Sequence, residues 1–179
     1  MSAGPKRRES AETPRRDPRI VHLTEAAEVT PTLVRWFIDA WTPWYGPDGE
    51  GDAEQDLAAC HSRDSLPICL VALGPDGEPL GTAALKSESA GSELGVGPWL
   101  AALLVGPVHR GRGVGTALIA AIEAEARRLG FPAIYVSTNV AEGLFRRRGW
   151  QPFATTSSLW GPVTVYRFPV SLSRVKSGS

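Results

Sequence analysis

The sequence predicts an α/β domain in which a mixed sheet of about six to seven strands is flanked by about four helices. Residues 100–105 form a short, wholly apolar run, as expected of a strand that is covered on both faces. From Gly113 onward the apolar residues recur instead at helical spacing, and only Glu125 breaks the stripe. Residues 133–138 are a second apolar run, which the βαβ rule makes parallel to the first. A strand, a glycine-rich turn, a helix and a parallel strand therefore form the centre of the fold.

The remaining elements follow from local patterns. Thr30-Pro31 is typical of a helix start, and Gly74 to Gly77 is typical of a turn between two hairpin strands. Further strands are expected at residues 19–23, 67–73, 80–86, 150–157 and 163–170, and further helices at residues 31–41, 52–61 and 141–148. We expect a polar, disordered tail at residues 1–18, one domain at residues 19–172 and a polar tail at residues 173–179.

Composition limits the function. The chain has 179 residues, 42% hydrophobic residues and a formal net charge of zero, which argues against nucleic acid or an anionic membrane as the main partner. It contains no apolar run of membrane length and no apolar signal-peptide core near Met1. Cys60 and Cys69 provide no disulfide framework, and no residues have metal-ligand spacing. We therefore expect a cytoplasmic, metal-free protein, either a monomer or a homodimer.

The turn after the first central strand predicts an anion site. Glycines occupy alternate positions at 111, 113 and 115, so a ligand can approach bare main-chain N–H groups. Those N–H groups open a helix and carry the positive end of its dipole, which favours a phosphate or a pyrophosphate. Arg110 and Arg112 add positive charge.

Spacing restricts the kind of phosphate ligand. The turn lacks the lysine of a nucleoside-triphosphate loop, and its glycines do not have the G-x-G-x-x-G spacing of a dinucleotide site. What remains is R-x-x-G-x-G at Arg110, Gly113 and Gly115, preceded by Val105-x-Pro107. This pattern resembles the acyl-coenzyme A loop of the GCN5-related N-acetyltransferase (GNAT) family.

A second motif supports this resemblance, which extends over about residues 20–170. Residues 139–150, NVAEGLFRRRGW, are similar to the family pattern N-x-x-A-x-x-[LF]-Y-x-x-x-G-[FW]. Counting back from Phe145 places the family's asparagine at Thr138, so Asn139 is offset by one position. The resemblance implies a GNAT-like acyl-CoA N-acyltransferase fold with acetyl-CoA as co-substrate. The cofactor contacts it implies are Leu103, Leu104, Val105, Arg110, Gly111, Arg112, Gly113, Val114, Gly115, Thr116, Asn139 or Thr138, and Phe145.

The sequence departs from the family at the general acid. The usual tyrosine is replaced by Phe145, which has no proton to give to the leaving thiolate. A thiol with its ordinary pKa of about 8.5 is a tolerable leaving group, so this loss need not abolish turnover. The catalytic residues are unknown. The candidates are Glu93, the acid nearest in sequence to the first central strand, and Ser137 and Thr138, which could position a water although they are weak bases.

The acceptor side is expected at the first two helices and the last hairpin loop. Trp44, Tyr45 and Trp160 are the expected substrate contacts, and residues 48–56 hold five acids and no base. The acids suit a helix start, and they also suit attraction of a cationic amine. The predicted function is transfer of an acetyl group from acetyl-CoA to a primary amine of a small molecule or protein, by direct attack in a ternary complex. The alternative is a weak or inactive CoA-binding regulatory or structural domain.

Overall fold

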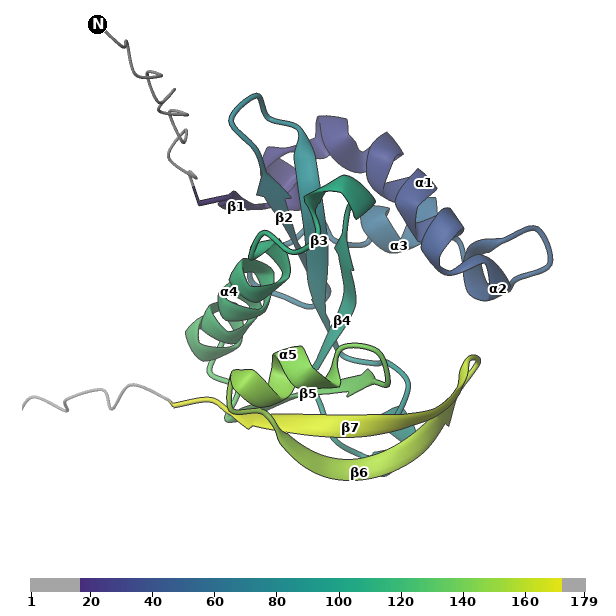
Figure 1. Cartoon of the computed structure of the whole chain (residues 1–179), viewed down its shortest axis with the longest axis vertical. Coiled ribbons are helices and arrows are strands. Elements are labelled where there is room, and N and C mark those ends of the chain that lie inside the picture. The colour runs from purple at the N-terminus through teal and green to yellow at the C-terminus, as the bar shows by residue number, and fades with distance from the viewer. Residues whose placement is uncertain (1–16, 172–179) are drawn as a thin grey trace, which may run out of the picture.

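The computed structural model describes residues 17–171 (Figure 1). Most of the expected N-terminal tail, and all of the tail expected at residues 173–179, lie outside this range. Seven strands are described: β1 Arg19–His22, β2 Ile68–Leu73, β3 Pro79–Lys86, β4 Trp99–Val105, β5 Ala133–Thr138, β6 Gln151–Ser158 and β7 Gly161–Pro169. The α-helices of the described range are α1 Thr30–Ala40, α2 Thr42–Tyr45, α3 Ala53–Ala58, α4 Val114–Arg128 and α5 Glu142–Arg147.

All seven strands belong to one sheet, in the order β1-β2-β3-β4-β5-β7-β6. Every neighbouring pair is antiparallel except β4 and β5, which are parallel. The predicted mixed α/β sheet and the predicted parallel central pair are therefore confirmed.

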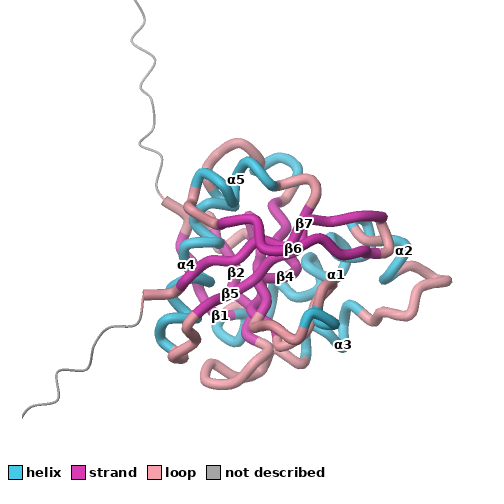
Figure 2. Tube along the Cα trace, turned by 90° about the horizontal axis from the view of Figure 1, so that it is seen from below, coloured by secondary structure: helices cyan, strands magenta, loops and turns pink. Residues whose placement is uncertain are grey.

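Helices cover both faces of the sheet (Figures 1 and 2). Alternation along the strands sends Ile68 and Leu70 toward α4 and α5, whereas Cys69 and Val71 join the cluster packed under α1 and α3. The two views agree that α4 lies on the side of the sheet away from α2, and that the turn of the β6–β7 hairpin extends toward the α2 side.

The parallel pair is almost entirely open. Between β4 and β5 the only paired residues are Trp99 and Tyr135, near the amino ends of the two strands. On its other edge β4 stays paired with β3 up to Val105, although the register shifts opposite Ala102. Ala102 has φ of +50°, an unusual value for a residue with a side chain. This bulge redirects β4 where it leaves β5, and the two strands separate toward their carboxyl ends.

Element ends differ from the sequence-based expectation where short-range contacts decide them. Thr30 is the first residue of α1 and does not cap it; Val29 precedes the helix. The helix expected at residues 52–61 is shorter, because Asp52 caps it through Gln55 N and the helix ends at Ala58. The helix α4 agrees with expectation, and Gly130 follows it with φ of +82°.

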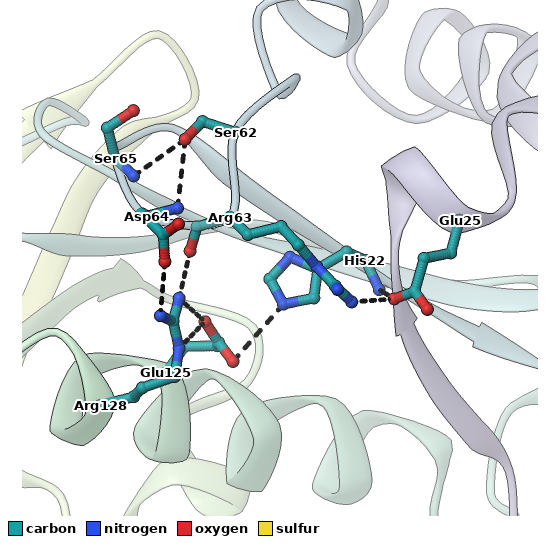
Figure 3. Close-up of polar contacts among 8 residues, drawn as sticks. All are labelled: His22, Glu25, Ser62, Arg63, Asp64, Ser65, Glu125 and Arg128. Carbon is teal, nitrogen blue, oxygen red and sulfur yellow. Dashed lines mark hydrogen bonds and ion pairs between the residues drawn. The ribbon is translucent and has the colours of Figure 1, made fainter.

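Glu125, the acid predicted to break the apolar stripe of α4, has structural partners (Figure 3), although the acid buried on this helix is Glu123. Glu125 lies 3.5 Å from His22 Nε2 on β1 and 2.8 Å from the Arg128 guanidinium. Arg128 also binds Asp64 at 2.8 Å, and Arg63 pairs with Glu25. These contacts connect the far end of α4 to β1 and to the segment before β2, and they fix the helix whose start carries the predicted anion site.

Candidate active site

The glycine-rich loop has the backbone conformation of an anion-binding turn. Gly111 and Gly113 have φ of +72° and +83°, and a Cβ at either position would meet no atom within 4 Å. Backbone conformation therefore requires glycine there, and the space beside the loop is open. The first backbone hydrogen bond at the start of α4 runs from Ala117 N to Gly113 O at 3.0 Å. Among the described residues, the N–H groups of Val114, Gly115 and Thr116 have no acceptor.

The open edge of β4 leads directly into this loop. Because β4 meets β5 only at Trp99, its backbone groups from Ala101 to Val105 on that edge have no partner strand. Leu103 and Val105 pack their side chains against the core under α4, while Leu104 packs on the α1 side. Leu103, Leu104 and Val105 are thus partly buried. Because Gly106 N donates to Leu80 O, the alternation of the ladder turns the backbone groups of Leu104 toward Thr82 on β3, and those of Leu103 and Val105 toward the open edge. Contact of these residues with a cofactor stays a prediction.

The two arginines of the loop lie on different cavities. Arg110 lines a cavity of about 290 Å³ together with Trp36, Asp39 and Leu104, and its Nε donates to the carbonyl of Val105 at 3.2 Å. Arg112 lines a second cavity, of about 440 Å³, with Glu78 and His109 among its walls. The loop is therefore basic on both sides of the helix start.

The hydroxyls expected to position water are engaged in loop structure. Ser137 donates to the carbonyl of Ala90, in the segment between β3 and β4. Thr138 is buried, and its Oγ1 accepts from Val140 N at 3.3 Å and Ala141 N at 3.1 Å. Asn139 is exposed at the carboxyl end of β5, beside the open side of the split.

Phe145 is a core residue. Its side chain is 1% exposed, and its ring meets Trp150 at 5.0 Å in an edge-on arrangement. The neighbouring Leu144 points to the loop, since its Cδ2 is 3.6 Å from the position of a Cβ on Gly115. Contact between Phe145 and a cofactor stays a prediction.

Glu93 is hydrogen-bonded to β6, the edge strand of the sheet. Its carboxylate accepts from Thr156 Oγ1 on β6. This hydrogen bond, followed by backbone hydrogen bonds, lowers the pKa of Glu93 below its ordinary value. A carboxylate with a lowered pKa is a weaker base than an ordinary glutamate, which disfavours Glu93 as the general base.

The aromatic residues of the expected acceptor side separate into two places. Trp44 and Tyr45 belong to a cluster with Phe37 and Trp41, and the Tyr45 hydroxyl donates to Asp56 at 2.6 Å. Trp160 is 49% exposed in the turn between β6 and β7, and none of the described aromatic contacts includes it.

Two features of the site had no signal in the sequence. Trp36, half-buried against the core cluster under α1, and the exposed Asp39 line the cavity at the end of β4, and neither residue type indicates a contact with that strand. The bulge at Ala102 falls inside a uniformly apolar run, with no glycine to indicate a positive φ. Both depend on how α1 and β4 meet in the folded chain.

Comparison with known proteins places these features in a family. The family model described as "Acetyltransferase (GNAT) family" matches residues 31–150. A mycothiol acetyltransferase of Clavibacter sepedonicus is 35% identical over 109 residues, which are 61% of this chain and 32% of that protein. The chain thus spans about a third of the length of the curated relatives that it matches.

Solved structures agree on the fold. An aminoglycoside 6'-N-acetyltransferase complexed with coenzyme A has a TM-score of 0.68 at 13% identity, over 87% of this chain and 98% of that chain. The acetyltransferase yncA from Salmonella typhimurium, solved with its cofactor acetyl-CoA, has a TM-score of 0.64 at 18% identity, over 92% of this chain and 100% of that chain.

In the described part of the chain, no helix has the length and apolar character needed to cross a membrane.

Four observations lead to one conclusion: the strand order, the split between β4 and β5, the glycine-rich start of α4 and the match over residues 31–150. The chain belongs to the acetyltransferase (GNAT) family.

Proposed function

We propose that this protein is an N-acetyltransferase that moves an acetyl group from acetyl-CoA to a primary amine in a ternary complex. The observation that carries the proposal is the juxtaposition of two sets of free backbone groups. One set is the open edge of β4 from Ala101 to the N–H of Val105, whose carbonyl accepts from Arg110, and the other is the helix start at residues 114–116.

The residues present fit acetyl-CoA. The helix start offers main-chain N–H donors, a dipole and two flanking arginines, which together suit a pyrophosphate. The free edge of β4 offers N–H and C=O groups in an extended row, which suit the amide groups of a pantetheine arm. When bound, the co-substrate supplies an activated thioester.

Residues of this chain would then have three tasks. Arg110, Arg112 and the N–H groups from Gly113 to Thr116 hold the pyrophosphate. Backbone groups of Leu103 and Val105 orient the acyl arm, with Asn139 or Thr138 on the facing strand. The split between β4 and β5 gives an amine access from the side of α1 and α2, where Trp44, Tyr45 and Trp160 are the proposed acceptor contacts.

No carboxylate, histidine or cysteine is assigned as the base. The acceptor amine must be neutral to attack, so turnover should rise with pH as the amine loses its proton. The leaving thiolate departs without the family's tyrosine, whose position is held by Phe145.

A thiol-release assay with a panel of primary amines tests the proposal. We expect amine-dependent release of coenzyme A and an acetylated amine detected by mass spectrometry. The alternative, a CoA-binding domain without turnover, is supported if calorimetry detects acetyl-CoA binding while no amine in the panel releases thiol. Absence of acetyl-CoA binding would contradict both.

A further inference from the structure

The cavity of about 290 Å³ between α1 and the end of β4 is lined in part by two side chains, Trp36 and Asp39, that have no role in the proposed transfer. Trp36 and Asp39 line it from α1, Leu104 and Gly106 from the end of β4, and Arg110 from the loop. The strand rises about 3.3 Å per residue, so Leu104 lies about 7 Å beyond Ala102, where β4 leaves its parallel neighbour. The cavity is thus beside the proposed reaction centre, on the acceptor face.

The charge of this cavity is set by Asp39 once a donor is bound. Asp39 is exposed and forms no ion pair with any residue in the described range. Arg110 reaches the same cavity, and the hydrogen bond from its Nε to the carbonyl of Val105 leaves its positive charge in place. The proposed function directs this charge to the pyrophosphate of the bound donor. The Asp39 carboxylate therefore remains as the uncompensated charge.

Trp36 adds a surface that suits a cation. Its indole lies against the backbone of Gly106, because a Cβ on that glycine would come within 2.8 Å of the ring. This contact fixes the ring at the wall of the cavity, which Asp39 also lines. A carboxylate beside an indole is an arrangement that binds ammonium groups through charge and cation–π attraction.

We propose that this cavity binds a second cationic group of the acceptor, one that does not react. The preferred acceptor is then a diamine, or another amine with a second positive charge, and Asp39 is the residue that determines this preference. Trp36 positions the bound cation. The inference rests on the proposed acetyl transfer and adds the charge of the acceptor to it.

Three amines of similar length test the inference. Cadaverine, pentylamine and δ-aminovalerate each carry a primary amine on a chain of five carbons. The other end is a second, equivalent amine in cadaverine, a methyl in pentylamine and a carboxylate in δ-aminovalerate. We expect kcat/KM for cadaverine to exceed that for pentylamine by about tenfold, with δ-aminovalerate the poorest substrate. In Asp39→Asn the ratio of cadaverine to pentylamine should fall to about two, the statistical value for two equivalent amines, through KM and not kcat, while pentylamine turnover is kept.

Glu28→Gln is the matched control. It removes one exposed acid just before the same helix, outside the cavity and without a described ion pair. The substrate ratio should stay as in the wild type, which separates a local effect of Asp39 from the overall field. A wild-type ratio of cadaverine to pentylamine of about two or less overturns the inference, and so does a larger preference that persists in Asp39→Asn.

Failure of the proposed function would be recognised separately. If none of the three amines is acetylated, binding of cadaverine to the CoA-loaded protein is measured by calorimetry, with pentylamine as the reference. Cadaverine binding that Asp39→Asn removes supports the cavity assignment even without turnover. No cadaverine binding overturns it, while acetyl-CoA binding and the wider amine panel decide the proposed function.

Discussion

Glu123 and Arg148 form a two-point ion pair that joins α4 to the end of α5. Arg148 donates from Nε at 3.0 Å and from a terminal nitrogen at 2.5 Å, and the Trp150 indole donates to the same carboxylate at 2.9 Å. The Glu123 side chain is 8% exposed, whereas that of Arg148 is 24% exposed. These hydrogen bonds to Glu123 also raise the pKa of Arg148. The two helices beside the proposed cofactor site are therefore fixed to each other by a buried carboxylate.

Loss of either partner should destabilise the protein unequally. Arg148→Met leaves a buried carboxylate with the indole as its remaining donor, and we expect a loss of about 3–5 kcal/mol in the free energy of unfolding. Glu123→Met leaves a guanidinium that water can reach, so the loss should be smaller, at about 1–3 kcal/mol. Urea unfolding measures both.

The double variant is the internal control. Because it contains no unpaired charge, Glu123→Met with Arg148→Met should lose less stability than the sum of the two single changes. Strict additivity would show that the pair is not coupled.

The glycine loop gives the second prediction. Gly113→Val should abolish acetyl-CoA binding in calorimetry, because φ of +83° is unfavourable for valine and the loop would change shape. Gly130→Val is the control, since Gly130 has nearly the same φ of +82° and equally open surroundings at the opposite end of α4. Both variants should lose about 1–2 kcal/mol of stability, and only Gly113→Val should lose the ligand. Equal affinity in the two would contradict the site.

The third prediction concerns the arginines of the loop. Arg110→Ala and Arg112→Ala should each weaken acetyl-CoA binding by about fivefold, less than the glycine change, because exposed ionic contacts contribute about 1 kcal/mol. Wild-type affinity should fall with added salt, since these contacts are ionic. Arg127→Ala, in the last turn of the same helix, should leave affinity unchanged. An affinity that does not depend on salt would argue against a pyrophosphate site.

Much of the fold could be predicted because its signals are local. The residues of β5 were predicted with the bounds they have in the structure, since a short apolar run between turn residues has few alternatives. The glycines of the loop were identified for the same reason, because a backbone position with a positive φ favours glycine. These signals depend on neighbours within a few positions.

The rest of the site depends on contacts between distant segments. Glu125 looked like a break in an apolar stripe, and only the folded chain brings His22 to it, whereas Arg128 is its neighbour on the same helix. Asp39 is far from β4 in the sequence, and only the approach of α1 to the end of β4 places it at the wall of a cavity. Ala102 has a positive φ because β4 must leave β5, a condition set by two strands and not by the alanine.

Tyr45 provides a prediction for stability at high pH. Burial, followed by the hydrogen bond to Asp56, raises its pKa above the ordinary value. Below a pH of about 10 the tyrosine is protonated in both the folded and the unfolded states, and its stabilising contribution is complete. Above that pH the unfolded state loses its proton first, so the contribution falls as the pH rises toward the folded pKa.

Tyr45→Phe should therefore have two effects. It should cost about 1–2 kcal/mol near neutral pH, because Asp56 loses its short hydrogen bond, and it should reduce the decline in stability above pH of about 10. Tyr135→Phe is the control, since none of the described hydrogen bonds involves the Tyr135 hydroxyl. Urea unfolding on both sides of pH about 10 checks this, and an unchanged alkaline decline would contradict the assignment.

Phe145→Tyr separates packing from catalysis. Because the Phe145 ring is 1% exposed against Trp150, an added hydroxyl enters covered space, and we expect a loss of about 1–3 kcal/mol in stability. The same placement predicts no gain in turnover. Phe168→Tyr is the control: Phe168 also stacks on Trp150, at 5.4 Å, but is only half-buried, so its hydroxyl can reach water and should cost less. Stability by urea unfolding and turnover by thiol release are measured on both variants. A rate increase of about 10²-fold or more in Phe145→Tyr would show instead that the hydroxyl reaches the leaving thiolate and acts as the acid that this chain lacks.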